Sequence, residues 1–255
     1  MRLQNKVALV TGGNTGIGRA IALKLAAEGA AIALHCHSHP EETRDVIQAI
    51  TDMGRRAQVF PADLSQAEHV AQLVRDVFGA FGQVDILVNN AGEQQEKPFL
   101  KIGLDEWDSV LGIDLRGTFM LSQAIAQRMV QHQSGGRIIN VTSVHETVPW
   151  QGYTPYCVAK AGEGMLTRNM ALELAPYQIT VNAVAPGAIA GGKNEALLND
   201  PQAVARMQAD IPLGRLGQPG EVAGMIVYLA SDEASYVTGS TFYIDGGMSQ
   251  QILDH

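Results

Sequence analysis

The sequence predicts a single α/β domain of the doubly wound type, with a parallel sheet of about seven strands covered by helices on both faces. Short apolar runs alternate along the chain with longer stretches in which apolar residues recur at helical spacing. The short runs are almost continuously apolar, which is typical of strands buried on both faces. The chain has 255 residues, of which 46% are hydrophobic, and it contains no internal repeat and no Pro- or Ser-rich linker. These features favour one domain with a sizeable core.

The first half of the chain is expected to alternate strands and helices. Gly29 and Gly54 follow the first two helical stretches, as glycine commonly does at a helix end. Ser65 stands before the third helix and is expected to be its N-cap. The predicted strands are 7–11, 30–35, 57–60 and 84–89, and the predicted helices are 16–28, 40–53 and 65–81.

The second half continues the alternation with longer helices. A helical region is expected at 105–132, followed by a strand at 136–142 and an irregular stretch that contains Pro149 and Pro155. A Gly-rich loop is expected at 187–194. The remaining predicted elements are a helix at 156–174, a strand at 179–184, a helix at 221–230 and a last strand at 241–244.

Composition excludes several classes of function. The net charge is −8 and the isoelectric point about 5.3, which argues against a nucleic-acid surface. No apolar run is long enough to span a membrane, since Lys24 and Glu28 interrupt the best candidate. A strand-like run begins at Lys6, so we expect no signal peptide. Cys36 and Cys157 have neither metal-ligand spacing nor a disulfide framework, and we expect a cytoplasmic protein with reduced thiols and no metal.

A glycine-rich turn joins the first strand to the first helix. The segment is Thr11-Gly-Gly-Asn-Thr-Gly-Ile-Gly18. Glycines allow a tight turn and a close approach of the backbone to a ligand, and the helix N-terminus offers free N–H groups and a positive dipole end. The glycine spacing differs from the common G-x-G-x-x-G. Its position between strand and helix nevertheless predicts binding of a dinucleotide pyrophosphate.

Two further segments follow strands at the same edge of the expected sheet. Asp63 follows the third strand and could accept a hydrogen bond from an adenine amino group, although it could equally be a helix N-terminal acid. The run Asn89-Asn90-Ala91-Gly92 follows the fourth strand. Its small residues would let the backbone lie beside a ribose, because ligands of doubly wound folds bind at the carboxyl ends of the strands.

Tyr156 and Lys160 are spaced by four residues on a predicted helix, with Ser143 upstream. Residues at this spacing share a helix face, so the lysine ammonium would stabilise a tyrosinate. A phenol has a reference pKa of about 10 and needs such help to act as a base near neutral pH. Tyr156 could then exchange a proton with a substrate oxygen that Ser143 holds.

Together these motifs, with Pro186-Gly187 and the closing Asp245-Gly-Gly, resemble the short-chain dehydrogenase/reductase family over nearly the whole chain. The resemblance implies a Rossmann-type homotetrameric oxidoreductase with a nicotinamide cofactor and a substrate lid around 188–214. It implies that Tyr156 is the general acid/base, that Lys160 lowers its pKa and holds the nicotinamide ribose, and that Ser143 orients the substrate. The expected cofactor-binding residues are Gly12, Asn14, Thr15, Gly16, Ile17, Gly18, His37, Ser38, Asp63, Leu64, Asn90, Ala91, Gly92, Tyr156, Lys160, Pro186, Gly187 and Ile189.

The segment Ser143-Val-His-Glu-Thr-Val-Pro-Trp150 resembles bacterial glucose 1-dehydrogenases. A sugar such as glucose is therefore the expected substrate, with a carbonyl or 3-oxoacyl reductase as the alternative and a non-catalytic nucleotide-binding regulator as a remote one. The expected substrate contacts are Ser143, His145, Tyr156, Glu93 and Asn194, with Glu96, Trp150 and Lys193 nearby.

Two positions depart from the family pattern. Asp114 stands in the run Asp114-Leu-Arg-Gly-Thr-Phe119, where the family usually has an asparagine that is thought to fix a water near the catalytic lysine. We place Asp114 among the catalytic residues and expect retained but altered activity, or a harmless replacement. Gly191 stands where a cofactor-contacting threonine is usual, which predicts a more mobile lid or weaker cofactor binding.

The cofactor is expected to be NADP, with NAD tolerated. Selectivity for NAD normally rests on an acid after the second strand, which binds the ribose 2′-hydroxyl. Here the run is His35-Cys-His-Ser-His39, which contains no acid. His37 and Ser38 could hydrogen-bond a 2′-phosphate instead.

Overall fold

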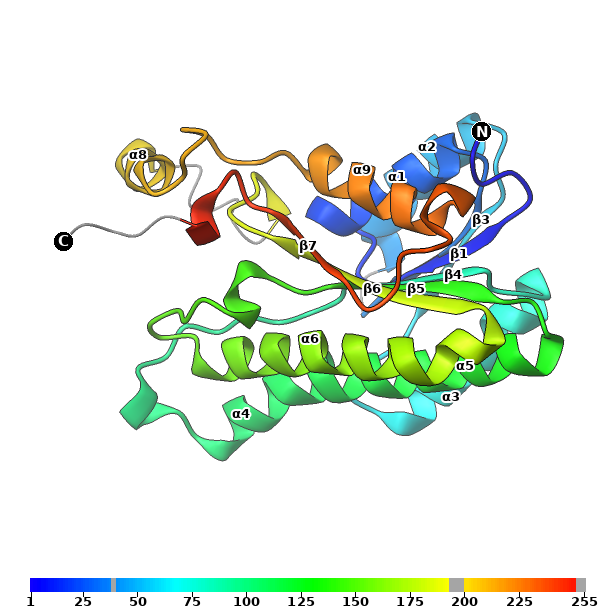
Figure 1. Ribbon diagram of the computed structural model, residues 1–255, viewed down its shortest axis with the longest axis horizontal. Coiled ribbons are helices and arrows are strands. Elements are labelled where there is room, and N and C mark those ends of the chain that lie inside the picture. Colours follow the sequence, from blue (N-terminus) through cyan, green and yellow to red (C-terminus); the bar gives the residue numbers. More distant parts are fainter. Residues whose placement is uncertain (38–39, 193–199, 251–255) are drawn as a thin grey trace.

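The computed structural model describes residues 1–37, 40–192 and 200–250. Its strands form one sheet in the order β3-β2-β1-β4-β5-β6-β7, and every neighbouring pair is parallel (Figure 1). The prediction of a single doubly wound domain with a parallel sheet is thereby confirmed. The strands are Val7–Val10 (β1), Ala31–Cys36 (β2), Ala57–Pro61 (β3), Ile86–Asn89 (β4), Gly136–Val141 (β5), Ile179–Pro186 (β6) and Thr241–Ile244 (β7).

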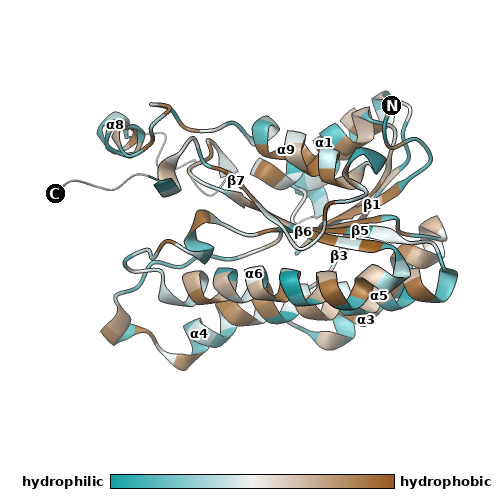
Figure 2. Cartoon of the chain, in the orientation of Figure 1, coloured by the Kyte–Doolittle hydropathy of each residue, from teal (hydrophilic) through white to brown (hydrophobic). Residues whose placement is uncertain are grey.

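Helices cover both faces of the sheet, as Figure 1 shows. One layer contains α1 (Gly16–Ala27), α2 (Arg44–Asp52) and α9 (Pro219–Ala230). The opposite layer contains α3 (Ala67–Phe81), α4 (Leu104–Leu111), α5 (Thr118–His132) and α6 (Thr154–Leu174). In Figure 2 the strands are largely hydrophobic, whereas the helices mix hydrophobic and hydrophilic residues, as expected for a sheet enclosed between two helical layers.

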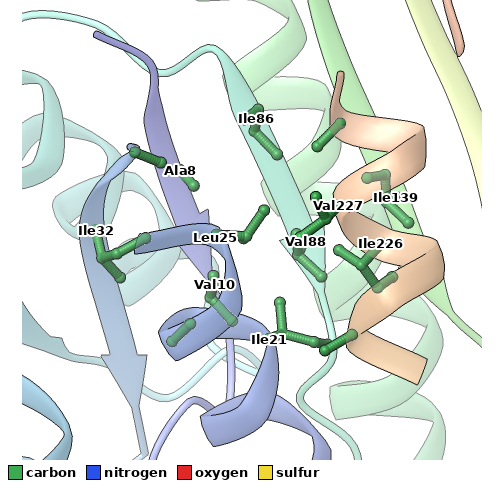
Figure 3. Close-up of a cluster of buried hydrophobic side chains, with 14 of the residues drawn as sticks. Ala8, Val10, Ile21, Leu25, Ile32, Ile86, Val88, Ile139, Ile226 and Val227 are labelled. Atoms are coloured by element: carbon green, nitrogen blue, oxygen red, sulfur yellow. The ribbon is translucent and has the colours of Figure 1, made fainter. Parts of the chain in front are cut away.

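The core between the sheet and the first helical layer holds α1, whose first turn is part of the glycine-rich segment. Ile21 and Leu25 of α1 are fully buried and face Ile226 and Val227 of α9 and Val88 of β4 (Figure 3). Burial of one such side chain stabilises the fold by about 1.5–3 kcal/mol. Packing of α1 therefore sets the direction in which its N-terminus points, toward the carboxyl ends of the strands.

A buried polar network ties the second helical layer to the sheet. The Asn89 side chain on β4 donates hydrogen bonds to Ser122 Oγ of α5 (2.9 Å) and to Asn140 Oδ1 of β5 (2.8 Å). Asn140 in turn donates to Thr167 Oγ1 of α6 (2.8 Å). All four residues are buried, so each bond replaces hydration that these groups lose on folding. The network positions α6 relative to the strands.

Several predicted elements differ from the observed ones. The single helical region expected at 105–132 is interrupted by a π-helical turn, η3 (Gly112–Gly117), between α4 and α5. Ser65 is not the N-cap of α3; the helix begins at Ala67, and Ser65 instead donates hydrogen bonds to Asp63. The first part of the helix predicted at 40–53 is a 3₁₀ turn, η1 (Pro40–Thr43). None of the helices among the described residues is long and apolar enough to cross a membrane.

Helix α8 (Pro201–Ala209) was not predicted. Asp200 caps it by accepting hydrogen bonds from the backbone N–H groups of Gln202 and Ala203, at 2.9 and 3.2 Å. Asp followed by Pro is a recognised start signal for a helix, since proline is tolerated at the first helical position. The signal was therefore present in the sequence.

Removing the amide of Asn140 tests the polar network. We expect Asn140→Ala to lower the free energy of unfolding by about 1–3 kcal/mol, because Asn89 and Thr167 lose a buried partner. Urea denaturation followed by circular dichroism measures the change. Gln131→Ala, at an exposed position of α5, is the control and should leave stability nearly unaltered. A loss no larger than that of the control would contradict this account.

Candidate active site

Three of the four residues predicted to be catalytic, Ser143, Tyr156 and Lys160, meet at the carboxyl edge of the sheet. Ser143 follows β5 and is the N-cap of a short 3₁₀ turn, η4 (Val144–Glu146), where its Oγ accepts a hydrogen bond from the His145 N–H. Tyr156 lies in the first turn of α6, and Lys160 lies one turn later on the same helix. All three line one cavity, which the glycine-rich turn completes on its other side.

The Tyr156 phenol is almost completely buried, with 9% of its surface exposed. Burial raises the pKa of this phenol, because the charged form loses hydration. The Lys160 ammonium and a hydrogen bond with Ser143 act in the opposite direction and lower the pKa of Tyr156. Of the other residues predicted to be catalytic, Ser143 and Lys160 therefore favour the tyrosinate, whereas the charge of Asp114 opposes it.

Lys160 is a buried cation held by two carboxylates. Its Nζ lies 2.6 Å from Glu163 Oε2 and 3.4 Å from Asp114 Oδ2, and it is 5.7 Å from the centre of the Tyr156 ring. Burial acts to lower the pKa of Lys160, but the charges of Glu163 and Asp114 outweigh it and hold that pKa above its usual value. Lys160 is therefore a permanent positive charge beside Tyr156.

The π-helical turn η3 delivers Asp114 to this cation. Such turns recur at functional sites because they shift the direction in which side chains point. Asp114 Oδ1 accepts a hydrogen bond of 2.6 Å from the Glu93 N–H, whereas Oδ2 is buried without a hydrogen-bond partner among the described residues. A Cβ on Gly92 would lie 2.9 Å from Oδ2, so the glycine leaves the space that the carboxylate occupies.

A stack of aromatic rings supports Tyr156. The rings of His145 and Trp150 are parallel, with centres 4.5 Å apart, and those of Trp150 and Tyr153 are 3.7 Å apart. His145 and Trp150 both present an edge to the Tyr156 ring, at 6.4 and 6.3 Å. Tyr153 anchors the stack by donating to Glu96 Oε2 (3.2 Å). His145 and Trp150, which were expected to contact substrate, are thus engaged in packing around Tyr156.

The glycine-rich turn has the form needed to receive a pyrophosphate. Gly12 and Gly16 have positive φ values of 62° and 53°, in the left-handed region that glycine adopts without strain. A Cβ on Gly18 would collide with the Gly12 carbonyl oxygen and lie 2.5 Å from Asn90 Nδ2. Asn90 Nδ2 donates to the carbonyl oxygens of Thr11 and Gly12, at 2.9 and 3.1 Å, and so ties the turn to the end of β4.

His35 supports the same turn by accepting a hydrogen bond from the backbone of the turn. Its Nδ1 accepts a hydrogen bond from the Gly12 N–H (3.3 Å), and its Nε2 donates to the Ala62 carbonyl oxygen (2.9 Å). Burial lowers the pKa of His35 to about 4, so the ring is neutral in the tautomer that these two partners require. The histidine is a structural support for the cofactor turn.

A second cavity adjoins the first and shares Gly12, Asn14, Ala91 and Gly92 with it. Asp63, Leu64 and His37 line this second cavity. Asp63 Oδ1 accepts two hydrogen bonds from Ser65, and it lies 4.0 Å from His37 Nε2. Two adjoining cavities along the strand ends could hold an extended dinucleotide, whose nicotinamide end would then lie beside Tyr156 and whose adenosine end would lie beside Asp63.

The predicted cofactor residues within the described part of the chain all line one or other of these cavities, including Pro186, Gly187 and Ile189. Glu93, predicted to contact the substrate, lines the second cavity and accepts a hydrogen bond from Ser109 Oγ (2.9 Å). Ser38, Lys193 and Asn194 lie outside the described residues. Among the described residues no group of His, Cys, Asp and Glu could hold a metal ion.

Two acids near the site were not identified from the sequence. Glu42 lies in the second cavity, where its Oε2 accepts a hydrogen bond of 2.9 Å from Asn14 Nδ2. Glu163 contacts Lys160 from the next turn of α6. The spacing of three residues between Lys160 and Glu163 was a usable signal, because it places both on the helix face that carries Tyr156.

Comparison with known proteins gives consistent matches over the whole chain. A family model described as enoyl-(acyl carrier protein) reductase matches residues 12–249. The 3beta-hydroxysteroid dehydrogenase 1 of Eggerthella lenta is 40% identical over 247 residues, which cover 97% of this chain and 95% of that protein. The 3-oxoacyl-(acyl-carrier-protein) reductase of Staphylococcus epidermidis is 38% identical over 244 residues, covering 96% and 99%. The crystal structure of acetoin dehydrogenase from Enterobacter cloacae superposes with a TM-score of 0.90 at 39% identity, covering 99% of this chain and 98% of that chain.

A methyl group at Gly18 tests the cofactor turn. We expect Gly18→Ala to weaken dinucleotide binding by roughly tenfold or more, which corresponds to about 1.4 kcal/mol, because the turn must open to admit the Cβ. Quenching or enhancement of reduced-nicotinamide fluorescence on titration gives the dissociation constant. Gly79→Ala in α3 is the matched control, since its Cβ would meet nothing within 4 Å. Equal affinities for the two variants would refute the assignment.

Proposed function

The chain belongs to the short-chain dehydrogenase/reductase family and is an oxidoreductase that acts on CH–OH groups, and we propose that its substrate is a small hydroxylated molecule. The observation that carries the proposal is that Ser143, Tyr156 and Lys160 line the same cavity as the glycine-rich turn. A reacting carbon between them would be within reach of a nicotinamide ring and of a proton-transferring phenol.

The residues of the cavity divide the chemistry among themselves. A nicotinamide dinucleotide, when bound, supplies hydride acceptance and donation. Ser143 holds the substrate oxygen by a hydrogen bond, and Tyr156 takes the hydroxyl proton during oxidation and returns it during reduction. Lys160 keeps the phenolate accessible by its positive charge. The glycine-rich turn and the run Asn90–Gly92 would hold the phosphates and ribose.

Support for a small polar substrate comes from the lining of the cavity and from one relative. Gln94 contributes an amide to the lining of the cavity that also contains Ser143 and Tyr156. The solved structure named acetoin dehydrogenase, at 39% identity, acts by its name on a small hydroxyketone. Glucose, the substrate predicted from the sequence, belongs to the same class of hydroxylated molecules but is not named by the relatives reported above. Relatives named for 3-oxoacyl and hydroxysteroid substrates make a carbonyl or 3-oxoacyl reductase the second candidate.

The assembly proposed for the enzyme is the homotetramer predicted from the family. Support comes from large apolar side chains that α5 and α6 leave exposed, because such patches often mark protein contacts. Phe119, Met165 and Leu172 are 43%, 52% and 77% exposed. We also propose a cytoplasmic location and a substrate lid around 188–214, of which residues 193–199 lie outside the described part of the chain.

An absorbance assay with a panel of substrates tests the reaction and the residue roles together. We expect turnover of acetoin or glucose to exceed that of a 3-oxoacyl thioester and of a hydroxysteroid, and Tyr156→Phe to lower kcat by about 10²–10⁴-fold. Retained binding of the cofactor by Tyr156→Phe, measured by fluorescence, controls for misfolding. Preference for the thioester would move the assignment to a 3-oxoacyl reductase, and an active Tyr156→Phe would remove Tyr156 from the mechanism.

His37 and Glu42 line the second cavity and would have opposite effects on the binding of a 2′-phosphate. We propose a preference for NADP that depends on His37 and is limited by Glu42, whose carboxylate would repel a 2′-phosphate. Glu42→Gln should raise the ratio of kcat/KM for NADP over NAD by roughly fivefold, or about 1 kcal/mol, because one like charge is removed. Glu68→Gln, an exposed acid of α3, is the control. His37→Asp should shift the ratio toward NAD, and an unaltered ratio in both variants would refute the proposal.

A further inference from the structure

Glu163 is a buried acid at the inner end of the catalytic face of α6. Tyr156, Lys160, Glu163 and Thr167 follow one another along this face, at spacings of three and four residues. Glu163 is 1% exposed and Lys160 is 4% exposed. Lys160 therefore lies between the phenol on one side and a carboxylate on the other, and water has almost no access to either contact.

The Lys160 ammonium is held directly by the Glu163 carboxylate. Lys160 Nζ is 2.6 Å from Glu163 Oε2, whereas it is 5.7 Å from the centre of the Tyr156 ring. The second oxygen of Glu163 accepts a hydrogen bond of 2.9 Å from Thr118 Oγ1 on α5. Both oxygens are thus engaged, which holds the carboxylate against the ammonium.

The cluster has more acids than bases. Asp114 and Glu163 contact the same ammonium, so the buried group would carry a net charge of −1 if both acids were ionised. Asp114 Oδ2 is buried without a hydrogen-bond partner among the described residues, as expected where one cation serves two carboxylates. Because an unbalanced buried charge is costly, burial and the neighbouring Asp114 carboxylate both favour the protonated form of Glu163 and raise its pKa.

We propose that Glu163 is a positioning residue that sets the pH range in which Tyr156 works, by competing with the phenol for the Lys160 ammonium. The inference rests on the roles proposed above for Tyr156 and Lys160. The charged groups that act on Glu163 are Lys160 of its own helix and Asp114 of η3, and the Thr118 hydroxyl of α5 donates to it. Burial raises the pKa of Glu163 to about 7, with the Asp114 charge adding to the rise and Lys160 opposing it.

The sign of the effect follows from the charges. Oxidation of an alcohol needs the tyrosinate, so the rate rises with pH through the pKa of Tyr156. An ionised Glu163 raises that pKa, because its negative charge opposes a second negative charge nearby and offsets the ammonium. Glu163 and Tyr156 therefore titrate as a coupled pair, in which Glu163 loses its proton first. Removing the acid should let Tyr156 ionise at lower pH.

The experiment compares pH profiles of kcat/KM for wild type and Glu163→Gln, with the most active substrate of the panel above. We expect the rising limb of the oxidation profile to move to lower pH by roughly one unit in Glu163→Gln. Glu173→Gln, an exposed acid farther along α6, is the matched control and should leave the profile unmoved. Ultraviolet titration of the tyrosinate band, as the difference between each protein and its Tyr156→Phe form, reports the same shift without turnover.

A second variant guards against a fold defect in Glu163→Gln. Thr118→Val removes the hydrogen bond to Glu163 but keeps the acid, which still loses its proton before Tyr156 does. The limb should therefore stay near its wild-type position in Thr118→Val, although the buried contact has been disturbed. Asp114→Asn and Glu163→Gln should act non-additively in the double variant, because both acids share Lys160.

The outcomes separate this proposal from the proposed function. A profile that is unmoved in Glu163→Gln or moves to higher pH, or one that moves as far in Thr118→Val as in Glu163→Gln, overturns the role of Glu163. An inactive Tyr156→Phe would still support the mechanism in that case. A Glu163→Gln protein with lower stability and equally lower rates at every pH would make Glu163 purely structural. Activity of Tyr156→Phe would overturn the proposed function itself.

Discussion

A lysine ammonium buried beside a phenol is the constraint from which much of the active-site architecture follows. Lys160 cannot lose its hydration without counter-charges, and the chain supplies Asp114 and Glu163. Asp114 reaches it because the helical backbone widens into a π-turn, and Gly92 leaves the room that the carboxylate needs. Asp114, which stands where the family usually has an asparagine, is therefore part of a charged cluster that also includes Glu163.

The sequence predicted the strands, the glycine-rich turn and the convergence of the cofactor residues well, because parallel strands bring their carboxyl ends to one edge whatever the details of packing. The sequence predicted helix boundaries less well where a tertiary contact determines them. The long helix at 105–132 was expected to be continuous, since a π-turn has no strong periodicity of its own. The prediction that Ser65 is an N-cap was wrong, because the Ser65 hydroxyl donates a hydrogen bond to the Asp63 carboxylate instead.

The candidate site was harder to predict than the fold for a related reason. His145 was expected to contact the substrate, and the structure shows that its ring packs in the aromatic stack that supports Tyr156. Glu93, expected near the substrate, lines the adjoining cavity, and its N–H donates to Asp114. Glu42 comes from the 3₁₀ turn after β2, so a search confined to the strand end could not find it.

The support of the glycine-rich turn by His35 links cofactor binding to acid tolerance. Its pKa of about 4 is depressed below that of an unfolded histidine, so its contribution to stability is present above about pH 6.5 and is lost as the pH falls through 4. A protonated ring would place a second N–H against the Gly12 N–H and release the turn. Acidification would thus release the dinucleotide by opening the turn that holds it, at a pH well below that at which Tyr156 and Glu163 take up protons.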